Sequence, residues 1–261
     1  MSNCTSATPP TESTGLYIRV DEMRFTPVDR GMCLIQNIEL SVPSNTFVSF
    51  LGSTGAGKTT LFRIIAGLEP TYVGRVCLDG SPVTGPSRDV QIVFQDYRLI
   101  PWMTVHQNIS FATRKDRNGR DDAAVQKSME IVGLVHVRDR WPKTLSGGEA
   151  GRVAFARAFV DQPKVLLLDE PFRSLDLTTR FALQDELLRA LNTQPATVLM
   201  ISHSIEDAVF MSDQIHILSR APMTIRKSFN VPFARPRKRD DPLLLKLINE
   251  ITCNVVSNNC S

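Results

Sequence analysis

Residues 46–66 read TFVSFLGSTGAGKTTLFRIIA and contain the strongest structural signal in the chain. The apolar run Thr46–Leu51 is typical of a buried strand, and Leu61–Ala66 has the pattern of an amphipathic helix. Between them, Gly52–Thr59 matches the pattern G-x-x-x-x-G-K-S/T. Glycines in such a turn let backbone N–H groups face phosphate oxygens beside the positive end of the helix dipole. The stretch therefore predicts a phosphate-binding loop, with an ordinary glycine-rich turn as the alternative.

The residues of this loop predict ATP and Mg²⁺ as ligands. Lys58 is expected to neutralise the β- and γ-phosphates, and the hydroxyl of Thr59 is expected to ligate Mg²⁺. The remaining contacts to the nucleotide are expected from Gly52, Ser53, Thr54, Gly55, Ala56, Gly57 and Thr60.

A second apolar run, Lys164–Leu168, leads into two acids, Asp169 and Glu170. Such a run is typical of a parallel strand that is covered on both faces, and ligands bind at the carboxyl ends of these strands. Asp169 is expected to hold Mg²⁺ through water, and Glu170 to polarise the water that attacks the γ-phosphate. Capping of the following helix is the alternative role for the two acids.

A third apolar run, Thr197–Ile201, is followed closely by His203. If this strand joins the same sheet, His203 lies at its carboxyl edge, and its imidazole is a candidate hydrogen-bonding partner of the γ-phosphate. A lone histidine after a strand is more often structural, so both roles stay open. The other three histidines, His106, His136 and His216, have no such setting and are expected at the surface or in packing.

Residues 145–159 read LSGGEAGRVAFARAF, in which Ser146 and Glu149 have the spacing of a capping box. The helix that follows is expected to bury its valine and its phenylalanines and to end before Gln162 and Pro163. On these residues alone, helix capping is the favoured interpretation, because no catalytic base or set of metal ligands lies beside them in sequence.

Composition and charge narrow the class of protein. The 261 residues, 42% hydrophobic and 22% charged, are enough for one large domain or a domain with a subdomain. The net charge of +3 is too small to imply nucleic-acid binding. No apolar run approaches the roughly 20 residues of a membrane-spanning helix, so any membrane role is expected to come through a partner. The five cysteines form no CxxC pair, which argues against zinc and disulfides.

The sequence is expected to form one folded region with a polar segment at each end. Residues 1–15 are rich in Ser, Thr and Pro and are predicted to be disordered, and residues 254–261 look similar. The folded region is expected to span 16–230, followed by a basic and helical tail over 231–261. Within that tail, the cluster RPRKR at 235–239 is expected to be solvated.

Taken together, the motifs resemble the nucleotide-binding subunit of an ABC transporter, over roughly residues 17–219. The phosphate loop is followed, in the family's order, by VFQD at 93–96, LSGGE at 145–149, LLLDEP at 166–171, SLD at 174–176 and then a histidine. The resemblance implies an α/β fold, with a P-loop NTPase core that has a mostly parallel sheet, an antiparallel β subdomain and an inserted helical subdomain over about 96–160.

The resemblance also implies roles for single residues. Gln95 is expected to contact Mg²⁺ and the catalytic centre, His203 to act as the catalytic switch residue, and Phe25 to stack on adenine. Asp176 is expected at the seam between two subunits, and Glu149 is expected among the nucleotide-binding residues.

In this family two chains enclose two ATP molecules head to tail, so that the LSGGE segment of one chain serves the nucleotide of the other. The resemblance therefore implies that Ser146 and the N–H groups of Gly147 and Gly148 contact a γ-phosphate bound by a partner copy. It further implies two membrane permease subunits at the cytoplasmic face of the inner membrane and, indirectly, an extracytoplasmic solute-binding protein. It implies no nucleic-acid partner.

Two positions depart from the family's usual pattern. Glu149 stands where glutamine or methionine is usual and brings a carboxylate near the triphosphate, which is expected to weaken closure. Gly151 stands where glutamine is common and is expected to cost roughly 0.5–1 kcal/mol of helix stability.

The subgroup is indicated by two short stretches. Residues 96–105, DYRLIPWMTV, are similar to the form found in importers of nitrate, taurine and alkanesulfonates, as is VPFARPR at 231–237. Leu99 and Trp102 are equally compatible with ordinary core positions. The favoured interpretation is the ATPase subunit of an importer for such a small solute, and the alternatives are a soluble ABC ATPase in DNA repair or translation and an exporter subunit.

Overall fold

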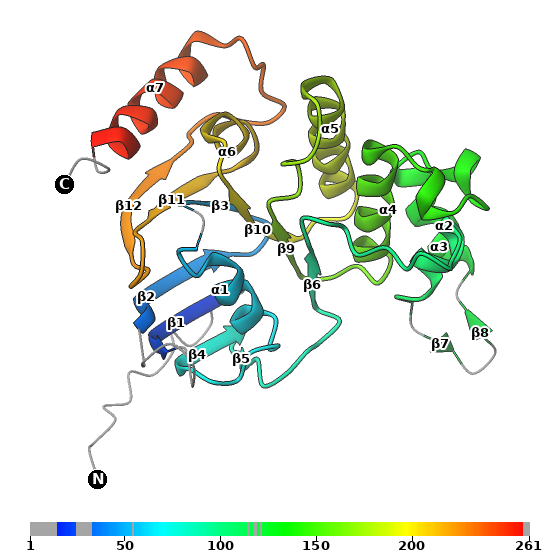
Figure 1. Ribbon diagram of the computed structural model, residues 1–261, viewed down its shortest axis with the longest axis horizontal. Coiled ribbons are helices and arrows are strands. Elements are labelled where there is room, and N and C mark those ends of the chain that lie inside the picture. Colours follow the sequence, from blue (N-terminus) through cyan, green and yellow to red (C-terminus); the bar gives the residue numbers. More distant parts are fainter. Residues whose placement is uncertain are drawn as a thin grey trace.

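The computed structural model describes residues 15–24, 33–53, 55–113, 115–116, 119–120 and 122–257. Within these residues the central feature is a six-stranded sheet in the order β12-β11-β3-β10-β9-β6 (Figure 1). The strands from β11 to β6 run parallel to their neighbours, and β12 is antiparallel to β11. The bounds are β3 (Phe47–Leu51), β6 (Val90–Val93), β9 (Val165–Asp169), β10 (Thr197–Ser202), β11 (Gln214–Leu218) and β12 (Ile225–Asn230).

The three apolar runs predicted as strands are β3, β10 and β9, and they lie side by side in the middle of this sheet. Every residue in the three strands is buried. Because successive side chains of a strand point to opposite faces, a strand that is buried throughout must be covered on both sides. The carboxyl ends of these parallel strands therefore meet at one covered edge, which carries the residues at positions 52, 170 and 203.

One face of the sheet packs against helix α1 (Lys58–Ile65), which in turn packs against an antiparallel sheet of order β2-β1-β4-β5 (Figure 1). The shared core includes Leu61 and Ile65 of α1 and Leu167 and Leu199 of the central sheet. The bounds of the antiparallel strands are β1 (Gly15–Arg24), β2 (Cys33–Pro43), β4 (Val73–Leu78) and β5 (Ser81–Pro82). This second sheet is the predicted antiparallel β subdomain.

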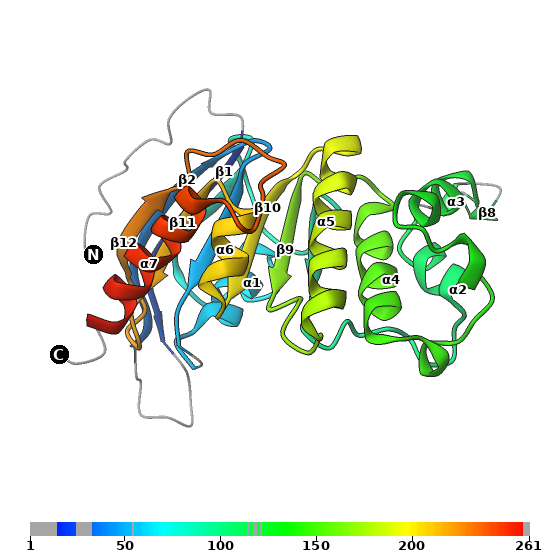
Figure 2. The same ribbon diagram turned by 90° about the horizontal axis from the view of Figure 1, so that it is seen from above.

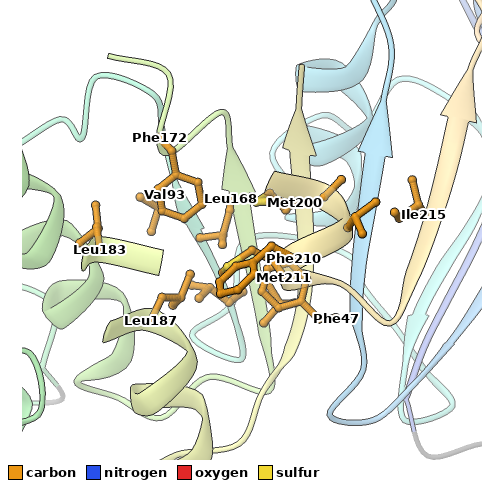
Figure 3. Packing of buried hydrophobic residues seen from close by; sticks show 14 of the residues in the cluster. Phe47, Val93, Leu168, Phe172, Leu183, Leu187, Met200, Phe210, Met211 and Ile215 are labelled. Atoms are coloured by element: carbon orange, nitrogen blue, oxygen red, sulfur yellow. The ribbon is translucent and has the colours of Figure 1, made fainter. Parts of the chain in front are cut away.

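The other face of the central sheet packs against helices α5 (Leu177–Thr193) and α6 (Ile205–Met211). Figure 3 shows Leu168 and Met200, from adjacent strands, beside Phe210 of α6 and near Leu187 of α5. The alternation along β9 explains the two cores, because Leu168 belongs to this cluster and Leu167 to the cluster around α1.

A helical region with its own core lies at one end of the molecule (Figure 2). It contains α2 (Val105–Ser110), α3 (Asp122–Ile131), the 3-10 turns Val135–Val137 and Pro142–Thr144, α4 (Gly147–Phe159), and the short strands β7 (Lys115–Asp116) and β8 (Gly119–Arg120). Helices α2, α3 and α4 lie within the stretch of about 96–160 where the sequence predicted an inserted helical subdomain. Trp102 is 72% exposed, so its interpretation as an ordinary core residue is wrong, whereas Leu99 is partly buried between two clusters.

The basic cluster at 235–239 is not a solvated tail, and that prediction is wrong. Arg237 is only 7% exposed and donates hydrogen bonds to the carbonyl oxygens of Val209, Phe210 and Ser212. These carbonyls lie at and just after the C-terminal end of α6, where helix carbonyls lack partners within the helix and carry partial negative charge. An arginine has five N–H donors and can bind several of these carbonyl oxygens at once, which explains why a charged residue is buried here.

The final helix, α7 (Pro242–Ser257), extends through residues that were predicted to be disordered from 254 onward. Its residues Leu244 and Ile251 are buried in the cluster around α6, and this packing supplies the order that the polar composition did not predict. Figure 2 places α7 at the end of the molecule opposite the helical region. Among the described residues, none of the helices combines the length and hydropathy needed to cross a membrane.

Candidate functional site

The glycine-rich loop connects the carboxyl end of β3 to the first turn of α1, as the sequence predicts. Gly55 and Gly57 have φ values of 81° and 95°, in the left-handed region that favours glycine. A Cβ at Gly57 would lie 2.9 Å from Cγ of Leu34 on β2, so a side chain is excluded there by contact as well as by conformation. Thr54 lies outside the described residues.

Lys58 is the first residue of α1 and is 5% exposed. Its Nζ donates to the carbonyl oxygens of Gly52 and Ser53, at 2.6 and 2.8 Å, so the loop curls around its own ammonium group. Burial lowers the pKa of Lys58, while the nearby carboxylates of Glu170 and Asp169 act in the opposite direction. A cation held inside a ring of backbone groups is suited to binding an anion at the mouth of the loop.

A cavity of about 340 Å³, here called the phosphate cavity, opens beside this loop. It is lined by Leu34, Gly55, Ala56, Gly57, Lys58, Thr59, Thr60, Gln95, Asp169, Glu170 and Arg173. The structure thus brings the predicted loop, the predicted acids and Gln95 to one place from three separate stretches of sequence. Leu34 and Arg173 were not predicted, and Phe25, the expected adenine-stacking residue, lies outside the described residues.

A hydroxyl and a carboxylate meet at the base of the phosphate cavity. Oγ1 of Thr59 donates to Oδ2 of Asp169 across 2.9 Å, and Asp169 is only 8% exposed. Burial raises the pKa of Asp169, and the hydrogen bond from Thr59 lowers it. Together with the amide oxygen of Gln95, these hard oxygen donors fit Mg²⁺, which binds one or two protein oxygens plus phosphate oxygens.

Glu170 has an unusual backbone and two basic neighbours. Its φ of 50° is uncommon for a residue with a side chain, and its N–H donates to the carbonyl of Ile201, across the ends of β9 and β10. Oε1 lies 2.7 Å from Nε2 of His203, and Oε2 accepts a 2.8 Å hydrogen bond from Nη1 of Arg173. Such strained conformations cluster at functional sites, and Glu170 lines the phosphate cavity.

The LSGGE segment forms the predicted capping box at the start of α4. Oγ of Ser146 accepts from the Glu149 N–H at 3.2 Å, and Glu149 Oε2 accepts from the Ser146 N–H at 2.7 Å. Oε1 of Glu149 also accepts a 3.0 Å hydrogen bond from Arg140. The hydrogen bond from the Ser146 N–H is the largest cause that lowers the pKa of Glu149, and the positive charge of Arg140 lowers it further. The Glu149 carboxylate is therefore already paired within its own chain.

The chain does not bring this segment to its own phosphate cavity. Ser146 and Gly147 are exposed, Gly148 is buried, and none of the three lines the cavity. Figure 2 shows α4 beside α5 and apart from α1. Asp176 also lies outside the cavity lining, where its side chain caps α5 by accepting from the Thr179 N–H at 3.0 Å.

Residues 35–173 match the family model described as ABC transporter. An aliphatic sulfonates import ATP-binding protein of Xanthomonas axonopodis pv. citri is 41% identical over 230 residues, which cover 87% of this chain and 90% of that protein. The chain belongs to the ABC transporter family. This result confirms the two predictions from the sequence, namely membership of this family and of the ATPase class.

Three further similarities extend this result. The Bacillus subtilis aliphatic sulfonates import ATP-binding protein is 39% identical, covering 86% of this chain and 88% of that protein. The bicarbonate transport ATP-binding protein of a Synechocystis strain is 40% identical over 86% of this chain, which spans 35% of that longer protein. A solved dimeric ATP-binding cassette, MJ0796 with ADP and Pi, superposes with a TM-score of 0.73 at 23% identity, covering 84% of this chain and all of that one. The predicted fold class is confirmed.

Proposed function

We propose that the chain is the ATP-hydrolysing subunit of an importer for a small anionic solute, with aliphatic sulfonates as the leading class. The single observation that supports ATP hydrolysis is the phosphate cavity, where the loop, Thr59 and Asp169 lie together with Glu170. The chain's membership of the ABC transporter family agrees with this activity. The names of the curated relatives support the importer and the sulfonate class.

The residues of the phosphate cavity divide the reaction among them. Lys58 and the loop N–H groups bind the β- and γ-phosphates, and Thr59, Asp169 and Gln95 would hold Mg²⁺, which neutralises charge on those phosphates when bound. Glu170 accepts the proton of the attacking water. His203 holds the Glu170 carboxylate through Oε1, which fixes the direction of the base.

The proposed working unit is a pair of copies arranged head to tail. The N-terminus of α4, exposed at Ser146 and Gly147, does not line its own chain's phosphate cavity, and the first N–H groups of a helix suit an anion, here one supplied by a partner. Permease subunits would meet the helical region, where Trp102 and Phe111 are 72% and 67% exposed. In this proposed arrangement the chain would work at the cytoplasmic face of the inner membrane, with a solute-binding protein as an indirect partner.

A complementation experiment tests this function. A strain that lacks the gene is supplied with the parental chain or with Lys58→Ala, and uptake of radiolabelled ethanesulfonate and of bicarbonate is measured. We expect the parental chain to restore ethanesulfonate uptake and Lys58→Ala to leave it at the level of the deletion strain. If the parental chain restores bicarbonate uptake instead, the proposed solute class changes from sulfonates to bicarbonate. If it restores neither uptake, the result contradicts the proposal of an importer for these anions.

A further inference from the structure

Arg173 lies in a tight turn directly after strand β9. Its N–H donates to the carbonyl of Glu170 at 3.3 Å, which folds the chain back on itself. Phe172, 2% exposed, anchors the turn in the core next to Val93 (Figure 3). Its ring also makes an edge contact with that of Phe155, with the ring centroids 6.4 Å apart. With the turn fixed in this way, the guanidinium of Arg173 is directed over the carboxylate of Glu170.

The side chain of Arg173 has more binding capacity than this contact uses. It is 53% exposed, whereas the side chain of Glu170 is 11% exposed. Within the described residues, the hydrogen bond from Nη1 to Glu170 Oε2 is the one that its guanidinium makes. A guanidinium carries five N–H donors in a planar fork, so most of the donors of Arg173 remain available to a ligand.

Arg173 also lies where a triphosphate would end. It lines the phosphate cavity together with Lys58 and Thr59, and it lines an adjoining cavity of about 130 Å³ with His203. Its positive charge is close enough to Lys58 to contribute to the lowering of that residue's pKa. Because the Arg173 side of this ion pair is half-exposed, water screens the attraction, so the contact with Glu170 is weak enough to be exchanged for a better partner.

We propose that Arg173 binds the terminal phosphate of ATP and gives up its contact with Glu170 when it does so. The inference rests on the proposed function, because it requires the phosphate cavity to hold ATP. A γ-phosphate carries more charge than a carboxylate and accepts the planar fork of arginine in a bidentate manner. His203 keeps Oε1 of Glu170 in place, so the exchange frees Oε2 for the attacking water without releasing the base. ADP lacks the phosphate that drives this exchange.

The test compares the affinities for two nucleotides in the full chain with Mg²⁺ present. Dissociation constants for ADP and for adenylyl imidodiphosphate, which is not hydrolysed, are measured for the parental chain, Arg173→Ala and Arg173→Lys. We expect Arg173→Ala to weaken the triphosphate analogue about tenfold and ADP less than twofold. Arg173→Lys keeps the charge but loses the fork, and we expect a loss of about threefold.

The matched control is Arg88→Ala. The side chain of Arg88 is 49% exposed and pairs with Asp161 at 2.7 Å, but it does not line the phosphate cavity, so neither affinity is expected to change. Thermal unfolding of each nucleotide-free variant checks that the fold is intact. Equal losses for both nucleotides, or no loss for either, in a folded Arg173→Ala chain would overturn the role at the terminal phosphate. A parental chain that binds neither nucleotide would overturn the proposed function itself, and this inference with it.

Discussion

At the scale of single residues, the chemistry depends on how Glu170 is held. Its carboxylate has one oxygen against His203 at 2.7 Å and the other against Arg173 at 2.8 Å. The sequence predicted Glu170 and made His203 a candidate, because both follow apolar runs that end at the same sheet edge. It did not predict Arg173, because a reversal of the chain over three residues after a strand has no periodic signal to reveal it.

Replacement of Glu170 by glutamine tests its role as a base. Glutamine keeps the size and the hydrogen-bonding oxygen but cannot accept the proton, so we expect kcat for ATP hydrolysis to fall about 10²-fold or more. The dissociation constant for ATP should change little, since the phosphate loop is untouched. Steady-state hydrolysis and equilibrium binding measure the two quantities. Glu130→Gln, at an exposed acid on α3, is the control, and hydrolysis by Glu170→Gln at the parental rate would show that the base is elsewhere.

His216 makes the folded chain sensitive to acid. It is 5% exposed on β11, its Nδ1 lies 2.7 Å from the Ser228 hydroxyl, and burial lowers its pKa from 6.5 to about 4. Between pH 6.5 and 4 the unfolded chain therefore binds a proton that the folded chain does not, so the free energy of unfolding falls as the pH falls through this window. A shift of this size corresponds to a loss of about 3 kcal/mol once the pH is below 4.

The mutation His216→Leu removes this titration and places an apolar side chain beside Phe50, whose ring centroid lies 5.6 Å from that of His216. We expect the free energy of unfolding of this variant to depend less on pH between 6.5 and 4 than that of the parental chain. Urea unfolding at pH 7.5 and pH 5 measures the difference. His136→Leu, at an exposed histidine, is the control. An unchanged pH dependence in His216→Leu would mean that other groups cause the acid sensitivity.

At the scale of elements, the local signals were predicted correctly, whereas the contact of the C-terminal segment with α6 was not. The strand, loop and helix of residues 46–66 and the capping box of Ser146 depend on neighbours within four residues, and the structure contains both. Arg237 was taken for part of a solvated tail, because nothing in the sequence says that its guanidinium reaches the carbonyls at the end of α6. The roles of Ser146 and Asp176 toward a nucleotide stay predictions, since a single chain cannot bring a partner's phosphates to them.

Gly151 shows how one element constrains another. A Cβ at this position of α4 would lie 2.8 Å from Cδ2 of Leu183 and 3.0 Å from Oη of Tyr97. The Tyr97 ring is held by its 2.8 Å hydrogen bond to the carbonyl of Pro171, and the guanidinium of Arg157 on α4 binds the Tyr97 carbonyl at 2.6 Å. The glycine therefore lets the loop after Gln95 pack against α4. The sequence predicted only the cost of this glycine to helix stability and not this packing role.

We expect Gly151→Ala to destabilise the chain. Alanine favours the helix by up to about 1 kcal/mol, and the end of the Leu183 side chain can move aside. The Tyr97 ring is held by its hydrogen bond, however, and overpacking against it costs about 1–3 kcal/mol, so the steric term prevails. Tyr97→Leu frees the space, and a double-mutant cycle measured by urea unfolding should give a coupling energy of about 1 kcal/mol between the two positions. Gly85→Ala, where an added Cβ meets nothing within 4 Å, is the control. A Gly151→Ala chain that is as stable as the parental chain would show that the contact relaxes at no cost.

At the scale of the whole molecule, the α4 N-terminus and the phosphate cavity are separate parts that one chain does not join. If Ser146, Gly147 and Gly148 act on a partner's ATP, a Ser146→Arg chain has a sound phosphate loop but damages the site that it lends to its neighbour. A Lys58→Ala chain has the complementary defect. Each mutant homodimer should then be inactive, whereas a mixed dimer has one site with both defects and one intact site.

Mixing the two inactive proteins, allowing subunit exchange and measuring ATP hydrolysis tests this arrangement. Equal amounts should yield about half mixed dimers, so we expect hydrolysis to recover to at most about a quarter of the parental rate, provided that one site can act alone. A mixture of Lys58→Ala with the double mutant Lys58→Ala/Ser146→Arg is the control, since it contains no intact phosphate loop. Without recovery, either both sites must act together or the segment works within its own chain. Crosslinking Ser146→Cys to Ser53→Cys distinguishes these, because an inter-chain bond in the presence of ATP requires the head-to-tail arrangement and its absence contradicts it.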